Sequence, residues 1–157
     1  MRFPEPAGFM HLLLTTCTAH KRHDAGLLPA TERYVDPRVD AAVALAARWK
    51  LPLVVFSGVY GLLDAAEPIP YYDHALQPDE VDGAATALAE RLVAAGVARI
   101  TAILEPRVVP GWAPYHDALE QGCQEAGVHL QVWTWDPIQR RVLDVVGVPG
   151  PAASSER

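Results

Sequence analysis

The sequence has few cysteines, no excess of positive charge and no long apolar run, and each shortage excludes a class of protein. Its two cysteines, Cys17 and Cys123, lie far apart and form no C-x-x-C pair, so we expect two free thiols and a cytoplasmic protein. The formal net charge of −6 disfavours a protein that coats nucleic acid through a broad positive surface. No run approaches the ~18 apolar residues of a membrane span, and the apolar run at residues 10–14 is too short for a signal peptide, so no membrane partner is expected.

Several catalytic and binding motifs are also missing. The chain has no G-x-S-x-G turn of a serine hydrolase, no G-x-G-x-x-G dinucleotide fingerprint and no phosphate loop of the Walker type. His20 and His23 are spaced neither as a helical pair of metal ligands nor as part of a zinc finger. We therefore expect no metal and no cofactor.

Length and composition are those of one globular domain. The chain has 157 residues, of which half are apolar and a fifth are charged. Residues 1–10 contain two prolines and predict an irregular N-terminal arm, and residues 11–147 predict a single α/β domain. Residues 148–157 are rich in Pro, Ala and Ser and predict a flexible C-terminal tail.

Apolar runs and helix signals alternate along the domain. Buried strands are predicted at 11–16, 53–57, 100–104 and 128–134, with a further edge strand at 141–146. Helices are predicted from the Asp36 cap and Pro37, from Pro78 to Gly96, and from Pro114 to about Gly127. This order favours a three-layer α/β sandwich, with a mainly parallel sheet of four or five strands and helices on both faces.

Polar and aromatic residues follow the carboxyl ends of the predicted strands, where ligands bind in open parallel sheets. These residues are Cys17, Thr18, His20 and Lys21; Ser57, Tyr60 and Gly61, with Tyr71, Tyr72 and Asp73 close behind; Glu105 and Arg107; and Trp133, Trp135 and Asp136. Structural interpretations compete with each of them. Cys17 and the tryptophans also fit core packing, Lys21 fits a solvated loop, and Ser57 with Gly58 fits a tight turn.

One block of the sequence resembles a known family. Residues 56–63, Phe-Ser-Gly-Val-Tyr-Gly-Leu-Leu, followed by Ile69 and the Tyr-Tyr-Asp-His-Ala-Leu of residues 71–76, are similar to the YaaA peroxide-stress proteins and to small uncharacterised bacterial proteins related to them. Cys17, Lys21, Ala30 and Tyr34 match residues of these small relatives. The resemblance covers residues 11–76 and does not extend to the glycine-rich segment that the relatives carry later.

The resemblance implies an α/β fold similar to that of uracil-DNA glycosylases and a link to nucleic acid or nucleotide metabolism. We expect an enzyme that hydrolyses or transfers at the N-glycosidic bond of a nucleoside, nucleotide or nucleobase. Asp73 would polarise water or stabilise a cationic sugar, Tyr72 or Tyr60 would orient the base, and Ser57 would hydrogen-bond to it. Lys21 would bind a phosphate together with main-chain amides near Thr18. Cys17, His20, Tyr34 and Gly61 complete the expected ligand site.

Two other functions remain open at this stage. The protein could be a stress protein that binds nucleic acid without chemistry, through a strip formed by Lys21, Arg22, Arg33 and Arg38. It could also keep the nucleotide pocket and act as a sensor or partner module. An acidic chain favours a small nucleotide-like ligand over a long polyanion.

Overall fold

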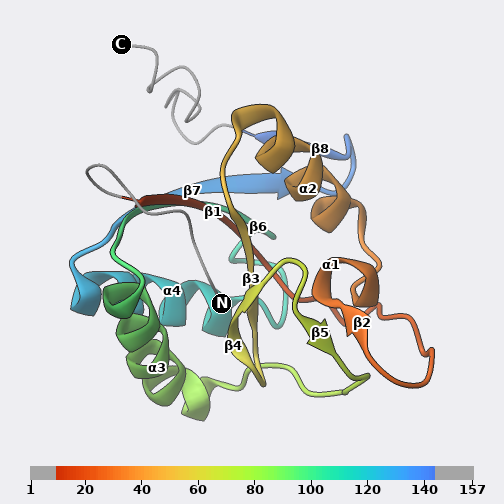
Figure 1. Cartoon of the computed structure of the whole chain (residues 1–157), viewed down its shortest axis with the longest axis horizontal. Helices are drawn as coiled ribbons and strands as arrows, with labels where there is room; N and C mark the ends of the chain where they lie inside the picture. The colour runs from red at the N-terminus through yellow and green to blue at the C-terminus, as the bar shows by residue number, and fades with distance from the viewer. Residues whose placement is uncertain (1–9, 144–157) are drawn as a thin grey trace.

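A six-stranded, mostly parallel sheet forms the centre of the computed structural model, which describes residues 10–143 (Figure 1). Four strands run parallel in the order β3 (Leu53–Ser57), β1 (Met10–Thr16), β6 (Val97–Leu104) and β7 (His129–Asp136). The antiparallel strands β4 (Gly61–Asp64) and β8 (Arg141–Leu143) flank them. The mixed α/β class is confirmed, although the sheet has six strands where the sequence predicted four or five.

The additional strand is β4, which forms a hairpin with β3. Ser57 pairs with Gly61, so residues 58–60 make the turn, and Gly61 adopts a φ of +68° that glycine tolerates without strain. Four residues are too few to display a strand periodicity, which is why the sequence showed only a turn here. A second, two-stranded sheet pairs β2 (Leu28–Pro29) with β5 (Pro68–Ile69).

The helices begin and end close to the predicted signals. Helix α2 (Pro37–Trp49) starts at Asp36, whose carboxylate accepts a hydrogen bond from the Arg38 amide at 2.8 Å. The 3₁₀ turn η1 (Pro78–Glu80) leads into α3 (Val81–Ala94), and α4 (Ala113–Ala126) ends at Gly127, where φ is +70°. A short helix, α1 (Ala30–Arg33), precedes α2.

Side chains of the central strands alternate between two apolar clusters. Leu13 of β1 packs with Ala42 and Ala46 of α2, whereas Leu12 and Leu14 belong to the larger cluster that includes α3 and α4. Figure 1 shows α3 and α4 side by side and α2 on the other side of the strands. Each cluster covers the sheet surface that its helices face.

Some sequence expectations change at the edges of the domain. Met10, assigned to the N-terminal arm, is buried as the first residue of β1. Strand β8 accounts for 141–143 of the predicted edge strand, and the rest of that strand, the remainder of the arm and the 148–157 tail lie outside the described residues. Trp133 and Trp135 lie within β7 as buried residues rather than after it.

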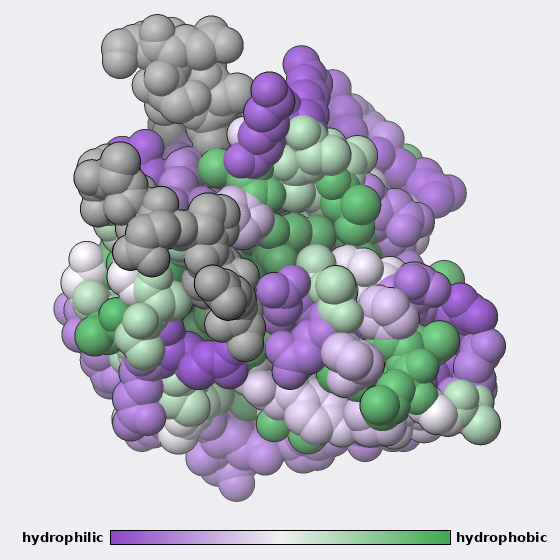
Figure 2. Space-filling model, in the orientation of Figure 1, coloured by the Kyte–Doolittle hydropathy of each residue, from purple (hydrophilic) through white to green (hydrophobic). Residues whose placement is uncertain are grey.

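The surface in the orientation of Figure 2 mixes hydrophobic and hydrophilic residues. Figure 2 shows hydrophobic residues in separate patches between hydrophilic ones. Within residues 10–143, no helix has both the length and the apolar character that a membrane span requires.

Two helical glycines test the packing between α3 and α4. A Cβ on Gly122 of α4 would lie 2.8 Å from the Leu88 side chain and 3.0 Å from the Ala85 carbonyl oxygen, whereas a Cβ on the exposed Gly83 of α3 would meet nothing within 4 Å. We expect Gly122→Ala to lower the free energy of unfolding by about 1–3 kcal/mol through overpacking. Gly83→Ala should raise it by up to about 1 kcal/mol through helix propensity. Urea denaturation measures both, and equal effects would contradict the close helix contact.

Candidate functional site

Strands β1 and β6 lie side by side at the centre of the sheet, and the chain leaves their carboxyl ends toward opposite faces. After β1 the chain continues to α2, whereas after β6 it continues to α4, which packs against the other side of the sheet. This divergence is the topological switch point at which open α/β sheets bind ligands. A cavity of about 190 Å³ lies there.

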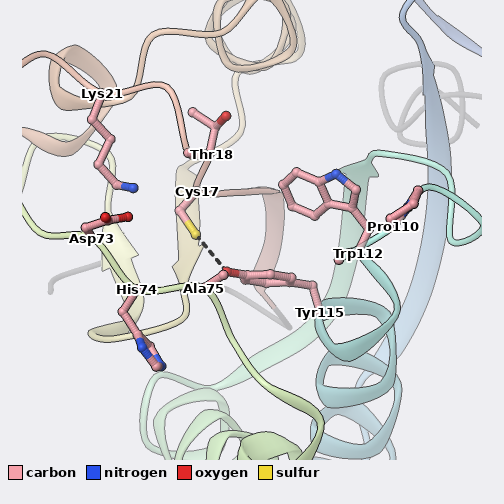
Figure 3. A pocket seen from close by; sticks show the side chains of 11 residues that line it. Cys17, Thr18, Lys21, Asp73, His74, Ala75, Pro110, Trp112 and Tyr115 are labelled. Carbon is pink, nitrogen blue, oxygen red and sulfur yellow. Dashed lines mark hydrogen bonds between the residues drawn. The ribbon is translucent and has the colours of Figure 1, made fainter.

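Three segments form the cavity walls (Figure 3). They are the loop after β1 (Cys17, Thr18, Ala19 and Lys21), residues 73–75, and the loop after β6 with the first turn of α4 (Pro110, Gly111, Trp112 and Tyr115). The buried lining residues Cys17, Thr18, Lys21 and Tyr115 form what we call the cavity floor. Asp73 and His74 are exposed at its rim, and Trp112 forms a flat aromatic wall.

Backbone pairing fixes the position of Lys21. Lys21 pairs with Tyr34 in an isolated antiparallel bridge, which is flanked by hydrogen bonds from the Val35 amide to the His20 carbonyl and from the Arg22 amide to the Arg33 carbonyl. The fully buried Arg33 guanidinium donates to the carbonyls of Arg22, Asp24, Gly26 and Ile69 at 2.8–3.2 Å. It therefore ties the Lys21 loop to the segment that leads to Tyr72 and Asp73.

The Lys21 ammonium has no polar partner among the described residues. Only 9% of the residue is exposed, and Nζ lies 4.6 Å from the Tyr72 ring centre and 5.9 Å from that of Tyr34. Figure 3 shows the Asp73 carboxylate on the same side of the cavity, but the two side chains form no ion pair. Cation–π contacts contribute about 0.5–2 kcal/mol, and they leave the three ammonium hydrogens without an acceptor among the described residues.

Three hydroxyl groups form a hydrogen-bonded chain beneath Lys21. The Ser57 Oγ accepts hydrogen bonds from the Val59 and Tyr60 amides at 3.1 Å and lies 2.8 Å from the Tyr72 hydroxyl. The Tyr72 hydroxyl in turn lies 2.6 Å from that of Tyr34. Burial raises the pKa of both tyrosines, and the nearby Cys17 raises it further, so both keep their hydroxyl hydrogens at neutral pH.

A second polar pair contributes to the cavity floor. The Cys17 thiol lies 3.4 Å from the Tyr115 hydroxyl, which also accepts a hydrogen bond from the Leu76 amide at 3.0 Å. Burial is the main cause that raises the pKa of Tyr115, so this residue also stays protonated. Gly58 approaches the same place closely, since a Cβ there would lie 2.8 Å from the Leu76 nitrogen and 3.0 Å from the Tyr115 oxygen.

Arg38 joins the two strand ends beneath the cavity. Its fully buried guanidinium donates to the Thr15 hydroxyl at 2.5 Å, to the Thr16 and Cys17 carbonyls at 3.0 and 3.2 Å, and to the Glu105 carboxylate at 3.3 Å. Its carbon Cζ also lies 5.0 Å from the Trp112 ring centre. Glu105 is itself partly buried, which raises its pKa although Arg38 acts in the opposite direction. Arg38 therefore holds the Cys17 backbone and the Trp112 wall in fixed relative positions.

The structure brings together some of the sequence-predicted site residues and separates others. Cys17, Thr18, Lys21 and Asp73 line the cavity. Tyr34, Tyr72 and Ser57 lie behind Lys21 and do not line the cavity. Ser57 accepts hydrogen bonds from the turn amides and orients the Tyr72 hydroxyl. Contact between Ser57 and a ligand stays a prediction. The Tyr60 ring packs edge-on against Tyr72, with centres 5.1 Å apart. His20 is exposed outside the cavity walls, and Gly61 begins β4.

The basic strip considered for nucleic acid binding does not form on the surface. Arg33 and Arg38 are fully buried, and most of their donors bind backbone carbonyls, the Thr15 hydroxyl and Glu105. Arg22 is paired with Asp24 at 2.8 Å. The sequence showed the charges of these residues but not the interior carbonyls that bind them.

Sequence reasoning missed Trp112 and Tyr115, and it assigned Arg38 to a surface strip instead of to the base of the cavity. Trp112 and Tyr115 stand at the start of α4, eight and eleven residues beyond the end of β6, and only the strand order places that helix start beside β1. The signal available was a Pro/Gly-rich loop followed by aromatic residues. In the part of the chain that the structure describes, no three His, Cys, Asp or Glu side chains gather closely enough to hold a metal ion.

The Arg38 interactions predict a large loss of stability on their removal. Arg38→Met leaves Glu105 and two strand-end carbonyls without a partner in the interior, so we expect the free energy of unfolding to fall by about 3 kcal/mol or more. Arg48→Met changes an exposed arginine of the same helix and should alter it by less than about 0.5 kcal/mol. Equal midpoints for the two variants in urea denaturation would contradict the role of Arg38.

Comparisons with known proteins do not indicate a function. No protein-family model matches the chain, and no curated protein and no solved structure shows a significant similarity to it. The functional conclusion therefore depends on the chemistry of the cavity.

Proposed function

We propose that the cavity binds a nucleoside, a nucleotide or a nucleobase in DNA, and that the protein catalyses hydrolysis or transfer at the N-glycosidic bond of that ligand. The observation that carries the proposal is Lys21, a largely buried residue that lines the cavity at the switch point of the sheet and whose ammonium has no hydrogen bond or ion pair among residues 10–143. A cation that faces a cavity and has no partner in the protein is available to bind an anionic or hydrogen-bond-accepting group of a ligand.

The cavity is large enough to enclose one part of a nucleotide, and the remainder of such a ligand would extend past the exposed rim. Sites for drug-sized ligands occupy roughly 300–1,000 Å³, whereas this cavity measures about 190 Å³. The Trp112 ring provides a flat face for stacking on a base, and Arg38 behind it fixes its orientation. The resemblance of residues 11–76 to the YaaA proteins supports the same ligand class.

Asp73 supplies the negative charge that glycosidic chemistry requires. Its carboxylate lies at the exposed rim of the cavity, with Lys21 on the same side. As the C1′–N bond breaks, the bonding electrons leave with the base and positive charge develops on the sugar. Asp73 stabilises that charge and accepts a proton from the water that forms the new C1′–O bond. The released base takes up a proton from solvent, so the reaction is a balanced hydrolysis.

The residues behind the floor position this machinery. Ser57 and Tyr34 hold the Tyr72 hydroxyl, and the Tyr72 ring supports the Lys21 ammonium. Tyr72 also precedes Asp73 directly in the chain. Ser57 and Tyr72 therefore act as positioning residues in this proposal, and Asp73 is the catalytic residue.

The second candidate function, nucleic acid binding without chemistry, depends on a basic surface. The burial of Arg33 and Arg38 removes two of the four residues of the strip on which it relied. A net charge of −6 also opposes association with a polyanion. The enzyme proposal needs only a single inward-facing cation.

Replacing Asp73 tests the enzyme proposal. Asp73→Asn keeps the size of the side chain and removes its charge, so we expect hydrolysis of nucleosides or nucleotides to slow by roughly a hundredfold or more. Asp79→Asn is the matched control, because Asp79 is an exposed carboxylate outside the cavity. Base release is measured by chromatography over a panel of nucleosides and nucleoside monophosphates, with melting temperature as the control for folding.

The opposite outcome identifies the alternative. If no substrate turns over and Asp73→Asn binds duplex DNA more tightly than the wild type, with a steep dependence on salt, the protein is a nucleic acid binder.

A further inference from the structure

The hydrogen bonds around the cavity floor contain more donors than acceptors. The Ser57 Oγ already accepts two amide hydrogens, which fill both of its lone pairs. Its own hydrogen must therefore go to the Tyr72 oxygen. The contact between Tyr72 and Tyr34 uses one of their two hydroxyl hydrogens, and among the described residues the other has no acceptor.

The Cys17 and Tyr115 pair also has one more hydrogen than it has acceptors for. The Tyr115 oxygen accepts the Leu76 amide hydrogen and contacts the Cys17 sulfur. If the thiol donates, both lone pairs of Tyr115 are occupied and its O–H hydrogen is left over. If the hydroxyl donates to sulfur instead, the S–H hydrogen is left over. In either arrangement one hydrogen of this pair lacks an acceptor within residues 10–143, and both residues line the cavity.

The Lys21 ammonium adds three further donors to this surplus. It is a group with no acceptor capacity, and it lies against the Tyr72 and Tyr34 rings next to the same floor. Asp73 is the only carboxylate among the described residues that line the cavity, and it lies at the exposed rim. A ligand group that settles on the floor therefore meets a positive charge and the unpaired hydrogen of the Cys17–Tyr115 pair, because Tyr34 and Tyr72 do not line the cavity.

From this surplus we infer that the cavity floor is an oxyanion subsite, where Lys21 and the unpaired hydrogen of the Cys17–Tyr115 pair bind an anionic oxygen group of the ligand. Phosphoryl and carboxylate groups share this chemistry, since both carry negative charge and only accept hydrogen bonds. The inference rests on the proposed function and narrows it. The substrate is an anionic nucleotide, such as a nucleoside monophosphate, and not a neutral nucleoside or a free base.

Anion-dependent stability tests the subsite without any catalytic assay. Inorganic phosphate and acetate are titrated separately into the full chain, with sodium chloride at matched ionic strength as reference. A ligand that binds only the folded state raises the melting temperature, by roughly 5–10 °C at a hundred times its Kd for a chain of this size. Stabilisation by phosphate, with or without acetate, supports a phosphoryl subsite for a nucleotide. Stabilisation by acetate alone assigns a carboxylate and overturns the nucleotide as substrate. Stabilisation by neither anion beyond chloride overturns the inference.

A matched pair of variants locates the effect. Lys21→Met keeps the aliphatic stem that packs on the tyrosine rings and removes the charge, so the anion-dependent shift should disappear. Lys50→Met changes the other lysine of the chain, which is exposed at the end of α2, and should keep the shift. A shift that survives in Lys21→Met places the anion elsewhere and overturns the inference. If Lys21→Met does not fold, Tyr115→Phe replaces it, and a full phosphate or acetate shift in that variant also overturns the inference.

The anion titration and the hydrolysis assay can fail independently of each other. Hydrolysis of neutral nucleosides without any anion effect would refute the subsite and leave the glycosidic activity standing. An anion effect that depends on Lys21, without turnover of any nucleotide, would refute the activity and leave the subsite standing.

Discussion

The buried guanidinium of Arg38 is the interaction on which the candidate site depends. Parallel strands end with unpaired carbonyls, and at a switch point the chain leaves neighbouring ends in opposite directions. Arg38 occupies this gap and binds the last residues of β1, the carboxylate that follows β6, and the aromatic wall of the cavity. Its planar group with five donors matches this set of acceptors in a way that a lysine would not. The cavity keeps its shape because the Arg38 side chain contacts both the end of β1 and the residues that follow β6.

The two buried arginines and the buried lysine differ in their partners. Arg33 and Arg38 give most of their hydrogens to oxygens of the protein, so their charges serve the fold. Lys21 contacts only aromatic rings with its ammonium among the residues described. The proposed preference for a small anion over a long polyanion follows from this difference, because the net charge is negative and the Lys21 ammonium lines the cavity without a partner among the described residues.

The elements of the fold could be predicted from local signals, and the site could be predicted only in part. The Asp36 cap, the prolines at helix starts and the apolar runs located α2, α4 and the four parallel strands to within three residues. The rule that ligands bind at strand ends also selected Cys17, Lys21 and Asp73 correctly as neighbours. Trp112 and Tyr115 were not predictable in this way, because their position depends on the strand order. The burial of Arg33 and Arg38 depends on backbone carbonyls, which no residue pattern displays.

The close approach of Gly58 to Leu76 and Tyr115 links the β3–β4 hairpin to the cavity. Ser57 accepts a hydrogen bond from the Val59 amide in the turn, and the Tyr115 hydroxyl accepts one from the Leu76 amide. Because Gly58 has no side chain, the turn can approach Leu76 and Tyr115 closely. The turn and the floor therefore share one set of contacts, although Tyr115 lies more than fifty residues after the turn in sequence. By thermodynamic reciprocity, a ligand that orders the floor also orders the hairpin, and a change that loosens the hairpin weakens the ligand by the same free energy. The stability of the β3–β4 hairpin at the outer edge of the sheet is thus coupled to ligand binding at the centre of the sheet.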